Sequence, residues 1–223
     1  MNSFITEFVN TSYYKQLIAK DDVVAILISG SQALDIVDEH SDYDLVVLTT
    51  SGLWEDVSKK YYLTYNGIKV HWYRVPLDRL TIFEEQGLLR LSGLNSLRSL
   101  RPELFIYTNS VYEQLIKLLY FHINEIADAS VYWLVKTNYE FIQDILQTGK
   151  ILEHNYSKRI YHLCVASYQI YREPLDVKFL LSIKRIKWQP VSDKYKQQAV
   201  IRLQKLMDHY LSLSGPPDCF SFS

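Results

Sequence analysis

With 223 residues, 48% of them hydrophobic and 14% aromatic, the chain can bury a sizeable core, which excludes disorder over most of its length. A formal net charge of −1 indicates no overall preference for nucleic acid or for a membrane surface. The two cysteines, Cys164 and Cys219, make no disulfide framework and have no metal-ligand spacing. Such cysteine usage fits a reduced, cytoplasmic setting. Because the longest strongly apolar run covers only residues 23–28, we expect a soluble protein with no membrane partner.

Charge is divided unevenly along the chain. Residues 1–105 carry ten Lys and Arg against fourteen Asp and Glu, whereas residues 106–223 carry fourteen against eleven. An acidic first part and a mildly basic second part would suit a metal site facing a phosphate-binding surface. Two solvated faces explain the same numbers equally well.

Strand-like and helix-like patterns alternate through the first hundred residues. Short continuous β-branched runs predict buried strands, and apolar residues at three- and four-residue spacing predict helices. The third strand follows the turn signal Tyr65-Asn66-Gly67 and ends at Pro76. We predict helices at residues 4–20 and 52–61, strands at 23–29, 43–50 and 68–75, and one or two short helices within 84–104.

The rest of the chain has helical periodicity. Helices are predicted at residues 111–126, 129–149, 156–172 and 192–211. Gly149 is expected to end the second of these, and Ser192 to cap the last. The segment 177–190 interleaves basic residues with a tryptophan, which is typical of an amphipathic surface helix and also compatible with RNA binding. The predicted fold class is α/β (α+β), with an α/β domain over residues 1–105 and an all-helical domain over residues 106–223.

Gly30 and Ser31 follow directly from the first predicted strand. A strand that runs into Gly-Ser and a short helix presents backbone N–H groups to an anion. Glycine lets a phosphate approach the backbone closely. Taken alone, the pair is a weak signal and favours a plain turn.

Five carboxylates lie within residues 35–44, up to the start of the second strand. Asp42 and Asp44 are separated by one residue, so strand alternation places both on one face, while Tyr43 and Leu45 point into packing. Neighbouring like charges are unfavourable unless a cation lies between them, and Mg²⁺ takes carboxylate and phosphate oxygens. The pair therefore predicts a nucleotide–metal site, with a solvated Asp pair as the alternative. The remaining three, Asp35, Asp38 and Glu39, are interpreted as solvated loop charge.

Gly30-Ser31, ten intervening residues and Asp42-Tyr43-Asp44 between apolar strands resemble the signature of the DNA polymerase beta-like nucleotidyltransferase superfamily. The string "SDYDLVVL" is similar to the form in its small bacterial members, which include aminoglycoside nucleotidyltransferases. The resemblance is specific over residues 23–50 and extends in topology to about residue 75. It implies a small mixed-sheet domain in which Gly30 and Ser31 hold a triphosphate and Asp42 and Asp44 bind Mg²⁺. Many members also carry a helical domain after the catalytic one.

His71 stands where that family usually supplies a third carboxylate from a later strand. The third acid completes a two-metal site and can help to deprotonate the attacking hydroxyl. A neutral imidazole can accept that proton but binds Mg²⁺ poorly. The alternatives are one metal, a base from elsewhere, loss of activity, or an ordinary strand-surface histidine. Other acids that could replace the third carboxylate are Asp78, Glu84, Glu85, Glu140, Asp144 and Glu153.

A basic cluster in the helical part is a second candidate for contact with a nucleotide. Lys158, Arg159 and His162 lie within about one helical turn, and the first two could neutralise a triphosphate. A solvated basic face with a packed histidine explains the same spacing.

The leading hypothesis is an enzyme that moves a nucleoside monophosphate, expected to be AMP from Mg·ATP, to an acceptor hydroxyl and releases pyrophosphate. Asp42, Asp44 and His71 are the catalytic candidates. The acceptor could be a small molecule, a protein side chain or an RNA end. The alternatives are a catalytically degenerate nucleotide-binding or regulatory protein of the same fold, and a protein-interaction module.

Overall fold

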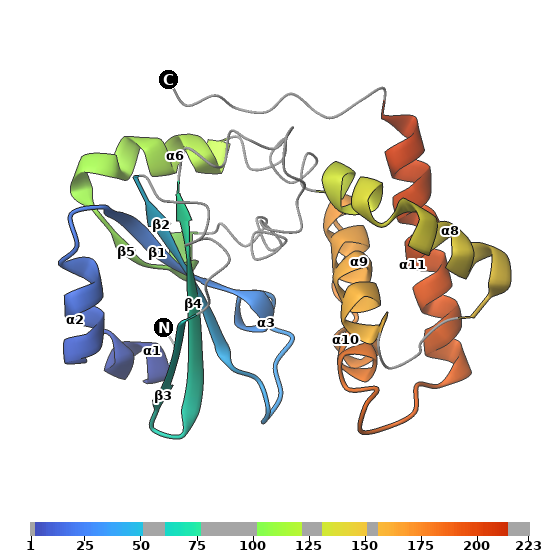
Figure 1. The fold of residues 1–223 in the computed structure, drawn as a ribbon, viewed down its shortest axis with the longest axis horizontal. Helices are drawn as coiled ribbons and strands as arrows, with labels where there is room; N and C mark the ends of the chain where they lie inside the picture. Colours follow the sequence, from blue (N-terminus) through green and yellow to red (C-terminus); the bar gives the residue numbers. More distant parts are fainter. Residues whose placement is uncertain (1–2, 51–60, 77–101, 122–130, 151–155, 214–223) are drawn as a thin grey trace. The chain divides into compact units, whose positions relative to one another are not determined.

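The computed structural model describes residues 3–50, 61–76, 102–121, 131–150 and 156–213. The chain divides into two compact units (Figure 1). The first comprises residues 1–86, 90–126 and 219–223, and the second comprises residues 87–89 and 127–218. A mixed β-sheet with helices builds the described part of the first unit, and helices build that of the second. This arrangement confirms the predicted α/β (α+β) class with a helical part.

The sheet of the first unit has five strands in the order β3-β4-β2-β1-β5. Strands β2 and β4 are parallel, and the other three neighbouring pairs are antiparallel. The strands are β1 (Val23–Ser29), β2 (Tyr43–Thr49), β3 (Tyr61–Tyr65), β4 (Ile68–Pro76) and β5 (Phe105–Thr108). The three predicted strands are therefore confirmed, with ends that differ by at most one residue.

Strands β3 and β5 were not predicted. A two-residue turn with positive φ at Asn66 (49°) and Gly67 (78°) joins β3 to β4, which is the backbone an Asn-Gly hairpin favours. The predicted helix at 52–61 lies outside the described residues except for its last residue, Tyr61, which begins β3. Strand β5 has only four residues, too few for a periodic signal. It starts at Phe105, so the sheet continues past the predicted domain boundary.

Two helices replace the single helix predicted for residues 4–20. They are α1 (Ser3–Phe8) and α2 (Ser12–Ile18). Thr11 separates them because its backbone is extended, and its hydroxyl accepts a hydrogen bond from the Tyr14 N–H at 3.1 Å. An N-cap of this kind begins a new helix and therefore interrupts the periodicity that the sequence suggested.

Helices α1 and α2 cover one face of the sheet (Figure 1). Phe4 of α1 stacks on Tyr43 of β2 with ring centroids 4.3 Å apart, and Phe8 is fully buried among the aromatic rings. The strand residues packed in the same cluster include Tyr43, Leu45, Val70 and Trp72. Side chains alternate along a strand, so the residues between these, Asp44 and His71, face away from this core.

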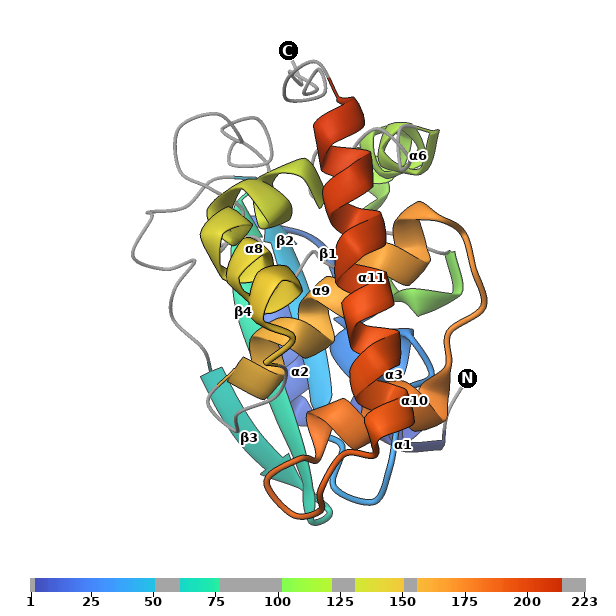
Figure 2. The ribbon, with the colours of Figure 1, turned by 90° about the vertical axis from the view of Figure 1, so that its right-hand side faces the viewer.

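The second unit is built from helices in the part that the structure describes (Figure 2). Residues 131–137 are helical, followed by α8 (Tyr139–Thr148), α9 (Ser157–Ile170), α10 (Val177–Lys184) and α11 (Asp193–Ser212). Helices α8 and α9 pack against α11, and α10 packs against α9. The predicted helix at 129–149 is interrupted at Asn138, a turn residue.

Two predicted helix ends in this unit are confirmed. Gly149 follows α8 with a φ of 64°, and the Ser192 hydroxyl accepts a hydrogen bond from the Tyr195 N–H at the start of α11. Helix α6 (Glu113–Phe121) belongs to the first unit and begins two residues later than predicted. Among the helices within the described ranges, none is both long enough and apolar enough to cross a membrane.

Replacing Phe8 tests how far the site-bearing sheet depends on its aromatic core. Phe8→Ala removes a fully buried ring and should lower the free energy of unfolding by about 3–5 kcal/mol. Urea unfolding followed by circular dichroism measures the change. Val111→Ala, at a side chain that is 78% exposed, is the control and should change stability by about 0.5 kcal/mol or less. Equal effects of the two substitutions would contradict the proposed packing.

Candidate metal site

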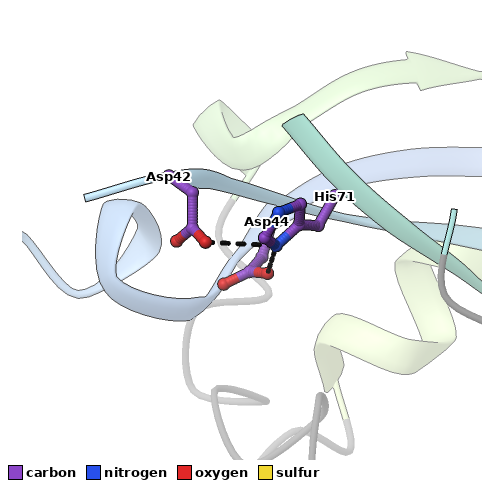
Figure 3. Close-up of side chains that lie close together, drawn as sticks. All are labelled: Asp42, Asp44 and His71. Carbon is purple, nitrogen blue, oxygen red and sulfur yellow. Dashed lines mark ion pairs between the residues drawn. The ribbon is translucent and has the colours of Figure 1, made fainter. Parts of the chain in front are cut away.

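The parallel pairing of β2 with β4 brings the candidate site together. Its register places Asp44 directly beside His71, and Asp42 lies two residues before Asp44, just ahead of β2. The His71 Nδ1 atom is 3.1 Å from Asp42 Oδ2 and 3.7 Å from Asp44 Oδ1 (Figure 3). Tyr43 and Leu45 are buried on the opposite face, which confirms the alternation predicted for this strand.

The spacing of the three side chains suits a shared cation. One ligand atom from each of Asp42, Asp44 and His71 can be chosen so that all three lie within 4.8 Å of one another. Neighbouring ligands of one ion, with bonds of about 2.0–2.2 Å, lie roughly 3–3.6 Å apart in octahedral or tetrahedral geometry. The side chains keep 34%, 27% and 18% exposure respectively, so a cation can reach them from solvent. The group therefore offers two carboxylate oxygens and one imidazole nitrogen as donors for a divalent metal ion, which would draw these atoms to ligand spacing.

Gly30 has no Cβ, and the Asp44 carboxylate occupies the space where one would lie. Its φ is 63°, in the left-handed region that favours glycine. A Cβ added there would lie 3.1 Å from Asp44 Cγ and closer still to its Oδ2. The Ser29 hydroxyl donates to the Asp44 carbonyl at 3.3 Å and ties β1 to β2 at the same level. Glycine at this position is thus a condition for the observed place of the carboxylate.

Ser31 lies in α3 (Gly30–Ala33), the short helix that follows β1 as predicted. The residue is 6% exposed, and its hydroxyl has no hydrogen-bond partner among the described residues. Buried hydroxyls are usually paired, so an unpaired one next to Gly30 suits a ligand that brings an acceptor oxygen. The role of Gly30 and Ser31 in holding a triphosphate stays a prediction.

The basic candidates Lys158 and Arg159 belong to the second unit, where both are exposed on the first turn of α9. The Arg159 guanidinium lies over the Phe141 ring at 4.8 Å from its centroid. His162 is half-buried with its ring edge-on to Tyr161. These contacts agree with a basic face beside packed rings, and nucleotide binding by Lys158 and Arg159 stays a prediction.

Three other carboxylates, Asp35, Asp38 and Glu39, lie in the loop that leads to Asp42. Asp38 Oδ1 accepts hydrogen bonds from the His40 N–H at 3.1 Å and the Ser41 hydroxyl at 3.0 Å, which closes a turn ahead of Asp42. Asp35 and Glu39 are exposed, in agreement with loop charge. Among the other carboxylates considered as a third acid, Glu140 and Asp144 lie on α8 in the second unit, and Asp78, Glu84, Glu85 and Glu153 lie outside the described residues.

Sequence reasoning missed three neighbours of the site that share its side of the sheet. Ser29, Asp44, His71 and Tyr62 form one row of paired residues across β1, β2, β4 and β3. The Tyr62 ring is 66% exposed and edge-on to the His71 ring at 4.7 Å. The Asn66-Gly67 turn could have predicted that Tyr62 lies beside His71, because a two-residue loop sets the register of the hairpin.

Tyr73 is the third neighbour, two residues after His71 and on the same face of β4. Burial raises the pKa of its hydroxyl, the Ser29 side chain lowers it and the Asp44 carboxylate raises it. Tyr73 is therefore a neutral residue near Asp44 at any physiological pH. Strand alternation from His71 was the available signal for it.

Comparisons with known proteins add a distant structural likeness. No family model matches the chain, and no curated protein matches it. Among solved structures, a nucleotidyltransferase-like protein from Exiguobacterium sibiricum 255-15 matches over 92% of this chain and 74% of its own. The two are 13% identical, with a TM-score of 0.37. A likeness this distant says nothing of the activity of this chain, so functional assignment depends on the side chains described above.

Gly30→Ala should disturb the site more than the fold. The added Cβ would meet the end of a side chain, so the Asp44 carboxylate should swing aside, and affinity for a divalent cation should fall by about tenfold or more. Calorimetry with MgCl₂ and MnCl₂ measures the affinity, and urea unfolding measures the stability.

Gly67→Ala is the matched control for that substitution. Gly67 also has positive φ, but a Cβ there would meet nothing within 4 Å. Both substitutions should cost about 1–2 kcal/mol of stability through backbone strain, while only Gly30→Ala should weaken cation binding. Equal cation affinity in the two variants would show that Gly30 does not shape the site.

Proposed function

We propose that the protein is a divalent-cation-dependent nucleotidyltransferase. The observation that carries the proposal is the convergence of Asp42, Asp44 and His71 beside Gly30. The reaction would transfer a nucleoside monophosphate from a nucleoside triphosphate to an acceptor hydroxyl. ATP is the expected donor, so the transferred group would be AMP and the second product pyrophosphate.

The proposed reaction is an in-line displacement at the α-phosphorus. The acceptor oxygen forms a bond to this phosphorus, and the bond from the phosphorus to the oxygen that bridges the α- and β-phosphates breaks. The bond's electrons leave with pyrophosphate, and the proton of the acceptor hydroxyl passes to a base or to water. Asp42 and Asp44 would hold the cation, which when bound supplies positive charge to the phosphate oxygens and the leaving group.

The chain's own residues would position the triphosphate. The backbone at Gly30 has no Cβ, so phosphate oxygens can approach it closely. The Ser31 hydroxyl, which has no hydrogen-bond partner in the part of the chain that the structure describes, can donate a hydrogen bond to one of those oxygens. The neutral imidazole of His71 offers one lone pair, which can either take the acceptor's proton or bind the cation.

A second candidate function is nucleotide binding without transfer. The observation that favours it is His71, which occupies the position of the acid that would complete the catalytic group in the resembled family. The acceptor of the transferase reaction would be a hydroxyl of a small molecule, a protein side chain or an RNA end, and a net charge of −1 favours RNA least.

Substituting the two aspartates tests the proposal. Asp42→Asn and Asp44→Asn keep the shape of the side chain but remove the charge that would hold the cation. Each should lower cation-dependent ATP binding and should reduce pyrophosphate release by about 100-fold or more. Calorimetry with ATP, with and without MgCl₂ or MnCl₂, measures binding, and α-labelled ATP with a panel of acceptors measures transfer.

Glu39→Gln is the matched control, because it neutralises an exposed carboxylate of the same loop. It should leave both readouts unchanged. Cation-dependent ATP binding that survives both aspartate substitutions would overturn the proposal. Binding that requires both aspartates but labels no acceptor and releases no pyrophosphate would favour the non-catalytic function.

A further inference from the structure

We propose that His71 is the third ligand of the cation and that the site therefore selects a later first-row dication, such as Co²⁺ or Zn²⁺, over Mg²⁺. The inference rests on the proposed function only through its cation site. It replaces the Mg²⁺ expected from the sequence with a different class of metal, and it gives His71 the role of ligand in place of base.

The position of one nitrogen atom is the first argument. His71 Nδ1 lies 3.1 Å from an oxygen of Asp42, within the spacing of ligands around a single ion, and 3.7 Å from an oxygen of Asp44, just beyond that spacing. The imidazole thus directs this nitrogen at the same point as the two carboxylates (Figure 3).

The backbone holds the imidazole in this place. His71 lies in β4 between two paired neighbours, Asp44 of β2 and Tyr62 of β3. The Tyr62 ring packs edge-on against it at 4.7 Å, and the His71 side chain is only 18% exposed. A ligand held by two strand pairings and a ring contact needs little rearrangement to bind a cation, which favours affinity.

The donor set decides which metal is preferred. Mg²⁺ is a hard cation that takes oxygen ligands and loses water reluctantly, whereas imidazole nitrogen suits later first-row dications. A third carboxylate would present three oxygens and three negative charges. Asp42, Asp44 and a neutral His71 present two oxygens, one nitrogen and two negative charges. Three protein ligands also leave coordination positions that phosphate oxygens can fill.

Substitution by the acid of the resembled family tests the inference. Calorimetry with CoCl₂, ZnCl₂ and MgCl₂ on the wild-type protein and on His71→Asp gives the affinity ratios of each later first-row metal to Mg²⁺. These ratios should fall by about tenfold or more in His71→Asp, because the variant loses the nitrogen and gains a hard oxygen. The ratios matter more than absolute affinities, since carboxylate sites in general also bind these metals.

His40→Asp is the matched control, since it makes the same change at an exposed histidine of the loop ahead of β2. Its ratios should equal those of the wild-type protein. Unchanged ratios in His71→Asp, or an equal fall in His40→Asp, would overturn the inference.

A spectroscopic measurement on the wild-type protein covers the case in which His71→Asp does not fold. Zn²⁺ added in stoichiometric amount to protein with ¹⁵N-labelled histidine should shift the imidazole nitrogen resonances of one histidine, identified as His71 by its loss in His71→Asn. No such shift would overturn the inference.

The two proposals fail separately. Pyrophosphate release that needs Asp42 and Asp44 but works equally well with Mg²⁺ in wild type and His71→Asp would remove this inference and keep the transferase. Coordination of the cation by His71 in a protein that transfers no nucleotide would keep this inference and overturn the transferase.

Discussion

The parallel pairing of β2 with β4 is the constraint on which the candidate site depends. It sets Asp44 beside His71, although the two residues are far apart along the chain. A slip of one residue would turn His71 toward the core and turn Val70 or Trp72 toward the site. Those two side chains are buried against the aromatic cluster of α1 and α2. The apolar face of the sheet therefore maintains the register that its polar face requires.

The polar face of the sheet holds two carboxylates close together, which is unfavourable unless other groups at the site compensate. Two carboxylates held close together repel each other, and a cation between them offsets that repulsion. The His71 nitrogen lies at ion-pair distance from both. Gly30 allows the Asp44 carboxylate to sit against the chain turn after β1, at a position where any side chain would push it away. Backbone conformation and charge thus converge on one small volume at the end of β1 and the start of β2.

Much of the fold was predictable because its signals are local. The β-branched runs of β1, β2 and β4 identify buried strands, and Ser192 and Gly149 identify helix ends through cap chemistry. The failures also have local causes. Thr11 caps a new helix inside an apparently continuous pattern, and Asn138 interrupts another. Strand β5 is too short to show a period, and it is recognised as a strand by its pairing with β1.

For the site, the sequence by itself determined which functional groups are present: a Gly-Ser turn, two aspartates on one strand face and a histidine on a later strand. Spacing within a single strand is set by covalent geometry, so Asp42 and Asp44 could be placed together without any structure. Only the tertiary structure decided that the His71 nitrogen lies beside the two aspartates and that Gly30 lies against Asp44. It also decided that Tyr62 lies beside His71 and that Tyr73 lies near Asp44. The reason is physical: strand order and register depend on how the whole sheet buries its apolar face, and no local pattern encodes that choice.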